Sequence, residues 1–448
     1  MGLRIIYGRA GSGKSEYCYK EISKNIDKNE KVFIITPEQN AFTAERKLME
    51  TIKTEAVLQA EVIHLSRLAK RVIKEIGNKD DRMTKCGKTM LISHILTTQK
   101  SKLKYLSKSE ENIDIAISSI TELKKHGVTV ERLKEQIENT ENIYLKTKLQ
   151  DIYYIYEQYN EQIKQSYIDE ADELAILAQN IEKIEWIKNS IIYIDEFAGF
   201  TYSEYQVIKE LIKYAKQVNI TITIDNIEKA LAPDTDIFYA NKITLEKLEN
   251  IVKKNNLEEE KPIKLEGQNR FKTPELEYIE KHLFDIKSTK YPQNVENISL
   301  FLAKNQYTEI ENIAKEITEL VKEKNKKYRE IAIITKNIQN YSNLAKVIFD
   351  KYDIPVFIDE KRELSQNIII QYILSIFEIL QRNYSKESVF QYAKMGFLDI
   401  EQEDIFKLEN YCTKWGIKQS KFKKDFHYEL ENNRQEVEHY NELRKKNN

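Results

Sequence analysis

Apolar residues recur along the chain in short runs, separated by segments with helix-like spacing. Four runs are rich in Ile and are typical of buried strands, and they lie at 3–7, 32–35, 191–194 and 219–225. The stretches at 16–25 and 40–52 instead repeat their apolar side chains every three or four residues, which indicates amphipathic helices. This alternation predicts an α/β fold with a parallel sheet and crossover helices.

A long helical pattern interrupts this alternation between about residues 80 and 188. The stretch is dense in Lys, Glu, Leu and Ile and poor in Gly and Pro, so we predict a helical insertion within a first domain over 1–260. Its tyrosines could form a stacking platform for single-stranded bases, but their helical spacing favours core packing. The tyrosines concerned are Tyr153, Tyr154, Tyr156 and Tyr159.

The chain beyond residue 260 repeats the α/β pattern. Residues 261–296 are polar and charged, which predicts a linker. A partial second domain is predicted over 297–448, ending in a helical segment, with strands at 298–302, 331–335 and 354–358 and helices at 307–322, 345–352 and 368–380. Lysines follow Thr413, and such a basic run is usually a solvated face, although DNA contact there stays an alternative.

Composition narrows the class of protein. The chain of 448 residues carries 71 Lys and Arg against 72 Asp and Glu, so its net charge favours no charged partner. A hydrophobic share of 41% argues against general disorder, and no apolar run reaches the length of a bilayer span. Cys18, Cys86 and Cys412 are too scattered for a metal cluster and suit a reduced compartment. We therefore predict a cytoplasmic protein without a membrane partner.

The first candidate site is a glycine-rich loop after the first predicted strand. It matches the pattern G-x-x-x-x-G-K-[ST] over Gly8, Arg9, Ala10, Gly11, Ser12, Gly13, Lys14 and Ser15. Such a loop turns backbone N–H groups toward phosphate, and the following helix adds the partial positive charge of its N-terminus. Lys14 is expected to pair with the β- and γ-phosphates of ATP, and Ser15 to ligate Mg²⁺. The alternative is a Gly-Ser turn that happens to precede a lysine.

The second candidate site is an acid pair, Asp195 and Glu196, that follows the apolar run at 191–194. Acids at the carboxyl end of a buried parallel strand lie where such sheets bind ligands. Asp195 is expected to hold the Mg²⁺ shell, and Glu196 to orient or deprotonate water. The alternative is that these acids only cap a helix that begins near Thr201.

The order of motifs resembles that of superfamily 1 helicases. The glycine-rich loop, VIHLSRLAKRV at 62–72 and IIYIDEF at 191–197 resemble the first motor domain, while IAIITKN at 331–337 and IPV at 354–356 resemble the start of the second. Within the superfamily, the runs GLRIIYGRAGSGKS, TPEQNAFTAERKL, IYIDEFAGFTYSEYQVI and IPVFIDEKREL are most similar to AddB, one of the two subunit families of bacterial AddAB helicase–nucleases. The resemblance spans essentially the whole chain and implies a RecA-like P-loop NTPase fold.

The resemblance also implies cofactors and partners. It implies ATP and Mg²⁺ at the glycine-rich loop, and a heterodimer with AddA, the subunit that drives unwinding. Together AddA and AddB resect double-strand breaks in DNA and respond to Chi, which AddB recognises. A nuclease domain and an iron–sulfur cluster are expected only in full-length members of the family. The chain is therefore interpreted as an N-terminal piece of a longer protein.

Several departures from active motors bear on hydrolysis. Ala198 and Gly199 stand where motors of the superfamily carry Gln-Asp, and no glutamine sensor follows Asp225. Lys336 stands where many motors place an arginine, which exchanges a bidentate fork for a point charge. The motifs that bring an arginine to the γ-phosphate are expected beyond Asn448. We predict that this piece binds ATP and hydrolyses it slowly or not at all.

Two other functions stay open on the sequence. One is a self-sufficient P-loop ATPase or small-molecule kinase, which would need a second phosphate-binding arginine that no motif supplies. The other is a scaffold whose nucleotide site is a relic that binds nothing.

Overall fold

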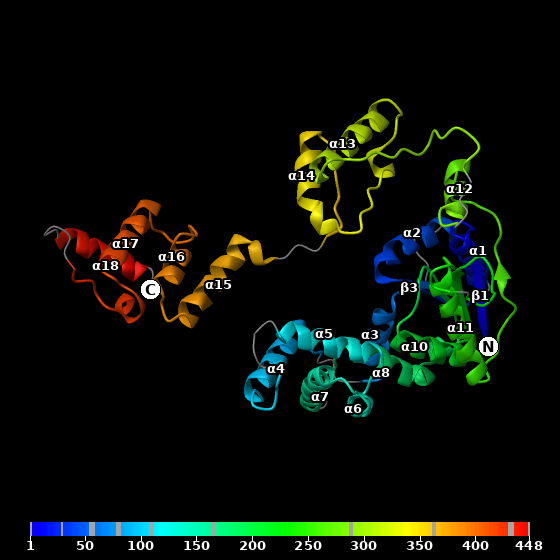
Figure 1. Cartoon of the computed structure of the whole chain (residues 1–448), viewed down its shortest axis with the longest axis horizontal. Coiled ribbons are helices and arrows are strands. Elements are labelled where there is room, and N and C mark those ends of the chain that lie inside the picture. The colour runs from blue at the N-terminus through cyan, green and yellow to red at the C-terminus, as the bar shows by residue number, and fades with distance from the viewer. Residues whose placement is uncertain are drawn as a thin grey trace. The chain divides into compact units, whose positions relative to one another are not determined.

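The chain divides into two units, Met1–Ser299 and Leu300–Asn448. The computed structural model describes residues 2–27, 30–52, 59–77, 82–106, 112–163, 167–230, 232–285, 290–360, 364–428 and 434–446 (Figure 1). The predicted start of the insertion near residue 80 lies outside these ranges. No helix among the described residues is both long and apolar enough to cross a membrane.

The first unit is built on a six-stranded sheet in the order β3-β2-β4-β5-β1-β6, in which all neighbours are parallel. Its strands are β1 (Leu3–Gly8), β2 (Lys31–Ile35), β3 (Ala60–Ile63), β4 (Ser190–Ile194), β5 (Gln217–Thr223) and β6 (Ile263–Lys264). The α/β fold predicted from the alternating pattern is confirmed. Parallel neighbours bring the carboxyl ends of the strands to one edge of the sheet, where the glycine-rich loop and the acid pair follow β1 and β4.

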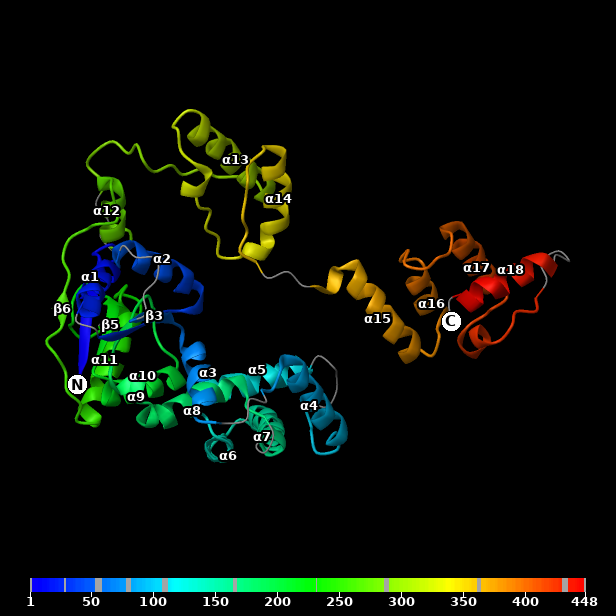
Figure 2. The same ribbon diagram turned by 180° about the vertical axis from the view of Figure 1, so that it is seen from behind.

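Helices cover both faces of this sheet (Figure 2). Alternate residues of β1 show the division, because Ile5 packs into one core and Ile6 into the other. The Ile6 side is covered by α1 (Lys14–Asp27) and α2 (Ala41–Ile52). The Ile5 side is covered by α3 (Leu65–Glu75), α8 (Glu173–Asn180), α10 (Tyr202–Tyr214) and α11 (Tyr239–Lys254), with the short α9 (Glu185–Lys188) beside them.

The helical insertion forms a core of its own. It consists of α4 (Lys85–Thr98), α5 (Asn112–Lys125), α6 (Val130–Glu138) and α7 (Ile143–Ile163). Tyr156 and Tyr159 are buried in this core, so the packing interpretation of the tyrosines is confirmed for these two. The chain from Leu177 to Ile187, which the sequence assigned to the insertion, instead packs into the core of the sheet.

The segment predicted as a linker, 261–296, is part of the first unit. Its residues Ile263 and Lys264 form β6, which pairs with the edge strand β1. It then forms α12 (Pro274–His282), which begins with proline in its first turn. The segment is therefore polar because it forms a solvent-exposed edge of the sheet domain, not because it is a linker.

The second unit departs from its predicted strands. In the described part of 300–446 the expected helices are present, as α13 (Gln306–Lys322), α14 (Ser342–Lys351) and α15 (Ile368–Gln381), followed by α16 (Lys386–Ala393), α17 (Gln402–Lys414) and α18 (Arg434–Lys446). The segments 298–302, 331–335 and 354–358 form no paired strand. Leu302 and Phe357 are consequently 99% and 89% exposed. Apolar composition specified extended backbone here, but a strand also needs a hydrogen-bonded neighbour.

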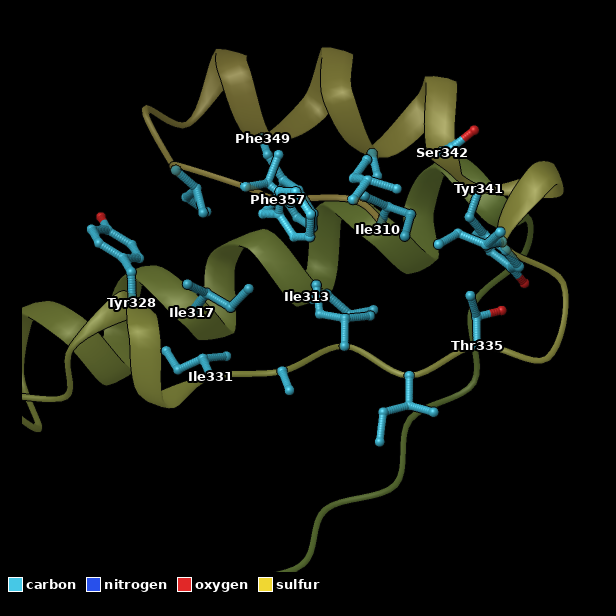
Figure 3. Close-up of a pocket in the computed structure, with 18 of the residues that line it drawn as sticks. Ile310, Ile313, Ile317, Tyr328, Ile331, Thr335, Tyr341, Ser342, Phe349 and Phe357 are labelled. Carbon is cyan, nitrogen blue, oxygen red and sulfur yellow. The ribbon is translucent and has the colours of Figure 1, made fainter. Parts of the chain in front are cut away.

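A cavity of about 830 Å³ lies in the second unit. Figure 3 shows Ile313 and Ile317 of α13, Phe349 of α14, and Ile331 and Phe357 of the two extended segments pointing into it. The side chains around it are mostly hydrocarbon. It is therefore a poor candidate for a phosphate ligand, which needs charged and polar partners.

Candidate nucleotide site

The glycine-rich loop joins β1 to α1 and turns at two glycines. Gly11 and Gly13 have φ values of +84° and +88°, a region that side chains with a Cβ rarely adopt. Within the turn, the backbone N–H of Ser12 donates to the carbonyl of Arg9 at 3.2 Å. Because α1 begins at Lys14, the loop delivers the positive end of the helix directly to the edge of the sheet.

The segment after β6 closes over this loop. The side-chain amide of Gln268 donates to the carbonyl of Ala10 at 2.9 Å, and the backbone N–H of Asn269 donates to the carbonyl of Gly11 at 2.8 Å. The approach is close, because a Cβ added at Gly11 would lie 1.8 Å from Oε1 of Gln268. The positive φ of Gly11 requires glycine at this position, whereas Gln268, a flexible side chain, could move away from a Cβ.

A cavity of about 620 Å³ opens between the loop, the acid pair and these residues. Seven of the residues proposed from sequence line it, namely Ala10, Gly11, Gly13, Lys14, Ser15, Asp195 and Glu196. Gly8, Arg9 and Ser12 do not line it. The structure thus brings the loop and the acid pair, which are about 180 residues apart in sequence, to one cavity at the edge of the sheet.

Lys14 lies inside the loop with its charge partly desolvated. Its Nζ donates to the carbonyls of Gly8 and Arg9 at 2.8 and 2.9 Å. Burial, only partly opposed by the negative charge of Asp195, lowers the pKa of the Lys14 ammonium from 10.5 to about 8. An arriving polyphosphate would supply the negative charge that favours the protonated lysine.

This pKa predicts the pH dependence of phosphate binding. Lys14 is charged at pH 7 and loses its proton as the pH rises through about 8, so the affinity for Mg-ATP should fall by up to about tenfold per pH unit above that value. Binding at pH 9 should take up protons, which calorimetry in buffers of different ionisation enthalpy measures. A constant affinity from pH 7 to pH 9.5 would contradict this assignment. Lys14→Arg is the control, because arginine stays charged over this range and its affinity for Mg-ATP should not fall as the pH rises.

The acid pair is held by β5, α2 and its own backbone. The Asp195 carboxylate is 3% exposed and accepts from the hydroxyl of Thr221 at 2.5 Å and from the N–H of Glu196 at 2.9 Å. Glu196 has a φ of +67°, a strained value for a residue with a side chain. Its carboxylate lies 3.8 Å from Nζ of Lys47 on α2. One oxygen of Asp195 is thus fixed in place, while Glu196 is turned toward the cavity.

The loop residues outside the cavity support it. The guanidinium of Arg9 pairs with Glu280 of α12 at 3.1 Å and lies 5.1 Å from the ring centroid of Phe238. The hydroxyl of Ser12 is buried and has no hydrogen-bond partner among the residues of the described ranges.

The donor set fits a magnesium nucleotide. Ser15 offers a hydroxyl, Asp195 a carboxylate, and Lys14 an ammonium, all lining one cavity beside a helix N-terminus. Arg270 lines the same cavity, and its charge contributes to the lowered pKa of Lys14. Together with Lys47, these are three cationic side chains in a cavity that four carboxylates also line, namely those of Glu16, Glu50, Asp195 and Glu196.

Several residues of this cavity were not predicted from the sequence. Arg270 and Asn269 belong to the segment interpreted as a linker, because β6 has only two residues and gives no strand signal. Lys47 and Asn241 lie on helices whose outward polar side chains look like ordinary surface. One general rule could have indicated Asn269 and Arg270. Residues that follow parallel strands meet at one edge of the sheet, and these two residues follow the strand that ends at Lys264.

A second polar cavity, of about 480 Å³, lies beside α3. Five cationic side chains line it together with Glu61 and Ile63, and they are Arg67, Lys70, Arg71, Lys74 and Arg82. Acidic partners lie close to two of them, Glu61 at 2.7 Å from Arg71 and Glu173 at 3.4 Å from Arg82. The other three form no ion pair with the residues that the structure describes, and Glu173 also lies within electrostatic reach of Lys70, so positive charge exceeds negative charge on this face of α3.

The cysteines form no cluster. Cys18 and Cys412 are buried and Cys86 is exposed, and all three are free. Across the described ranges, no group of three or more His, Cys, Asp or Glu side chains converges in a way that could hold a metal ion.

The fold defines the class of this protein, and its similarity to known sequences defines the family. The parallel sheet with its helices on both faces is that of an α/β RecA-like domain. The family described as "ADDB, N-terminal" matches residues 5–280, which is more than half of the chain. The chain therefore belongs to the AddB family.

Relatives at 37–40% identity are named as the B subunit of an ATP-dependent helicase/deoxyribonuclease. The protein of Thermoanaerobacter sp. (strain X514) is 40% identical over 96% of this chain and 38% of its own length. That of Clostridium novyi (strain NT) is 37% identical over 99% of this chain and 40% of its own length. The chain thus spans about two fifths of the curated relatives it matches.

Proposed function

We propose that this chain binds ATP with Mg²⁺ at the cavity between the glycine-rich loop and the acid pair. The observation that carries the proposal is that Lys14, Ser15 and Asp195 line one cavity. In this assignment Lys14 and Arg270 bind phosphate oxygens, and Ser15 and Asp195 hold the metal ion. When bound, the metal ion neutralises phosphate charge. Glu196, which lines the same cavity, orients a water molecule beside the phosphates.

We propose further that the chain is the helicase-like part of the AddB subunit of a heterodimeric helicase/deoxyribonuclease. The names of its relatives support this role. In this role AddA is the partner, and the complex resects double-strand breaks in DNA for recombinational repair and recognises Chi. The nuclease domain and its iron–sulfur cluster would belong to the longer protein.

Binding of a fluorescent ATP analogue tests the nucleotide proposal directly. We expect saturable binding that strengthens with Mg²⁺. A chain that binds no analogue at any Mg²⁺ concentration would instead be a scaffold with a relic site.

Arg270 gives weight to a second function, a self-sufficient ATPase. Such an enzyme needs an arginine that binds phosphate in addition to the lysine of the loop. Arg270 lines the same cavity as Lys14. An arginine that stabilises transferring phosphate is often worth 10³–10⁵ in rate. We nevertheless expect slow turnover of ATP. Ala198 also lines the cavity, and its methyl side chain offers no hydrogen bond to phosphate or water.

Turnover of ATP with and without single-stranded DNA separates these two functions. Slow turnover that DNA does not change supports an ATP-binding role without motor activity. Stimulation of tenfold or more that Arg270→Ala abolishes and Arg270→Lys partly retains would identify a working ATPase.

The cationic face of α3 is our candidate for DNA contact in the first unit. Arg67, Lys70 and Lys74 lie at helical spacing around the cavity beside α3. Ammonium and guanidinium groups that form no direct ion pair suit the phosphate backbone, which carries most of the affinity of non-specific DNA binding.

The salt dependence of DNA binding tests this interface. Replacing Arg67, Lys70 and Lys74 by alanine should lower the slope of log affinity against log salt by about 2 for single strands, since each phosphate contact contributes roughly 0.7. A control variant removes three exposed lysines elsewhere, Lys100, Lys134 and Lys254. An equal change of slope in both variants would indicate a general charge effect rather than this interface.

A further inference from the structure

Tyr19 has an unusual position in the first unit. It lies on α1, one helical turn after Ser15, and its side chain is 3% exposed in the core between α1, α2 and the sheet. Its hydroxyl is buried and has no hydrogen-bond partner within the described part of the chain. A buried phenol normally finds a partner, because an unpaired hydroxyl loses its bonds to water without replacement.

The surroundings of the hydroxyl identify the kind of partner. Tyr19 lines the same cavity as Asp195 and Glu196. Burial raises the pKa of the Tyr19 phenol, and the two carboxylates raise it further, so the hydroxyl keeps its proton and can donate. It donates to neither carboxylate directly. A small polar species inside the cavity that Tyr19 lines could accept this hydrogen bond.

We propose that Tyr19 is a positioning residue that donates a hydrogen bond to a water held beside the metal ion by Asp195 and Glu196. This inference rests on the proposed nucleotide function. A water bridges polar groups that are too far apart to bond, and it needs several polar partners to stay ordered. Tyr19 supplies the donor, and the two carboxylates supply acceptors for the protons of the water.

Tyr193 offers a matched control on the same face of the sheet. Its side chain is 1% exposed, but its hydroxyl is fully engaged, donating to Glu21 at 3.1 Å and accepting from Asn25 at 3.1 Å. Removing this hydroxyl by Tyr193→Phe takes a partner from Glu21. Tyr19→Phe also removes a hydroxyl, but no protein group in the described ranges loses a hydrogen-bond partner.

Two measurements test the proposal on the full chain. The first is thermal unfolding without nucleotide, in which Tyr19→Phe should match or exceed wild type while Tyr193→Phe unfolds at lower temperature. The second is binding of a fluorescent ATP analogue during a Mg²⁺ titration. There Tyr19→Phe should raise the half-saturating Mg²⁺ concentration about three- to tenfold, the effect of one lost hydrogen bond, and Tyr193→Phe should leave it unchanged.

Each outcome decides between alternatives. Wild-type binding together with an unchanged Mg²⁺ requirement in Tyr19→Phe would overturn this inference and leave the proposed function standing. An equal loss of affinity with Mg²⁺ and with EDTA would assign the hydroxyl to a phosphate oxygen, which also overturns it. Absence of nucleotide binding by wild type would overturn the proposed function and this inference with it.

Discussion

Lys14→Ala is expected to lose the stabilisation that Mg-ATP gives to wild type. A ligand present at 100 times its dissociation constant adds about 2.7 kcal/mol to the free energy of unfolding. Lys14 is the cation inside the loop, where its Nζ lies 2.8 and 2.9 Å from two loop carbonyls, and its replacement leaves the phosphates without that charge. We expect at least about a hundredfold loss of affinity, which removes nearly all of the shift in unfolding temperature.

The control for this prediction is Lys20→Ala. Lys20 lies on the same helix, and its side chain is exposed and pairs with Glu16 four residues earlier. Exposed pairs of this kind contribute little to stability, so Lys20→Ala should retain the full shift. A Lys14→Ala protein that Mg-ATP stabilises as strongly as wild type would contradict the placement of the triphosphate in this loop.

Asp195→Asn is expected to remove the benefit of Mg²⁺ while preserving the fold of the site. The amide oxygen of asparagine can still accept from Thr221 and from the N–H of Glu196, so only the negative charge is lost. A group that orients a metal ion or its water shell typically contributes 10- to 100-fold to metal affinity. We therefore expect a loss of about this size in the Mg²⁺ titration of ATP binding, and no loss in EDTA.

Asp225→Asn is the matched control, because Asp225 follows the neighbouring strand β5. Its carboxylate lies 3.4 Å from Nζ of Lys242 and does not line the nucleotide cavity. The Mg²⁺ titration should match that of wild type. If Asp195→Asn behaves in the same way as Asp225→Asn, the metal ion does not bind at the end of β4.

The parts of the site that sequence predicts are those with strong local signals. The glycine-rich loop is specified by consecutive residues, since φ values of +84° and +88° require Gly11 and Gly13. Asp195 follows the continuous apolar run of a central strand, and the parallel sheet rule places its side chain at the edge where the loop lies. Both sets of residues line the cavity that the structure shows.

The parts that sequence misses depend on neighbours far away along the chain. Arg270 follows β6, which pairs with β1, and the two residues of β6 are too few to show a strand pattern in the sequence. The segments 331–335 and 354–358 show the opposite error. Their apolar residues satisfy the strand pattern, but no partner in the described second unit completes their hydrogen bonds.

The contacts after β6 have a practical consequence for dissecting the protein. A truncation after residue 260, where polar composition places a boundary, would delete the partners of the glycine-rich loop, including Gln268 and the Glu280 that pairs with Arg9. Such a truncation would also expose the backbone of β1 along the side that β6 covers. An expression fragment ending at Ser299 retains the whole first unit, including every residue that contacts the glycine-rich loop after β6, and is the fragment of choice for nucleotide-binding experiments.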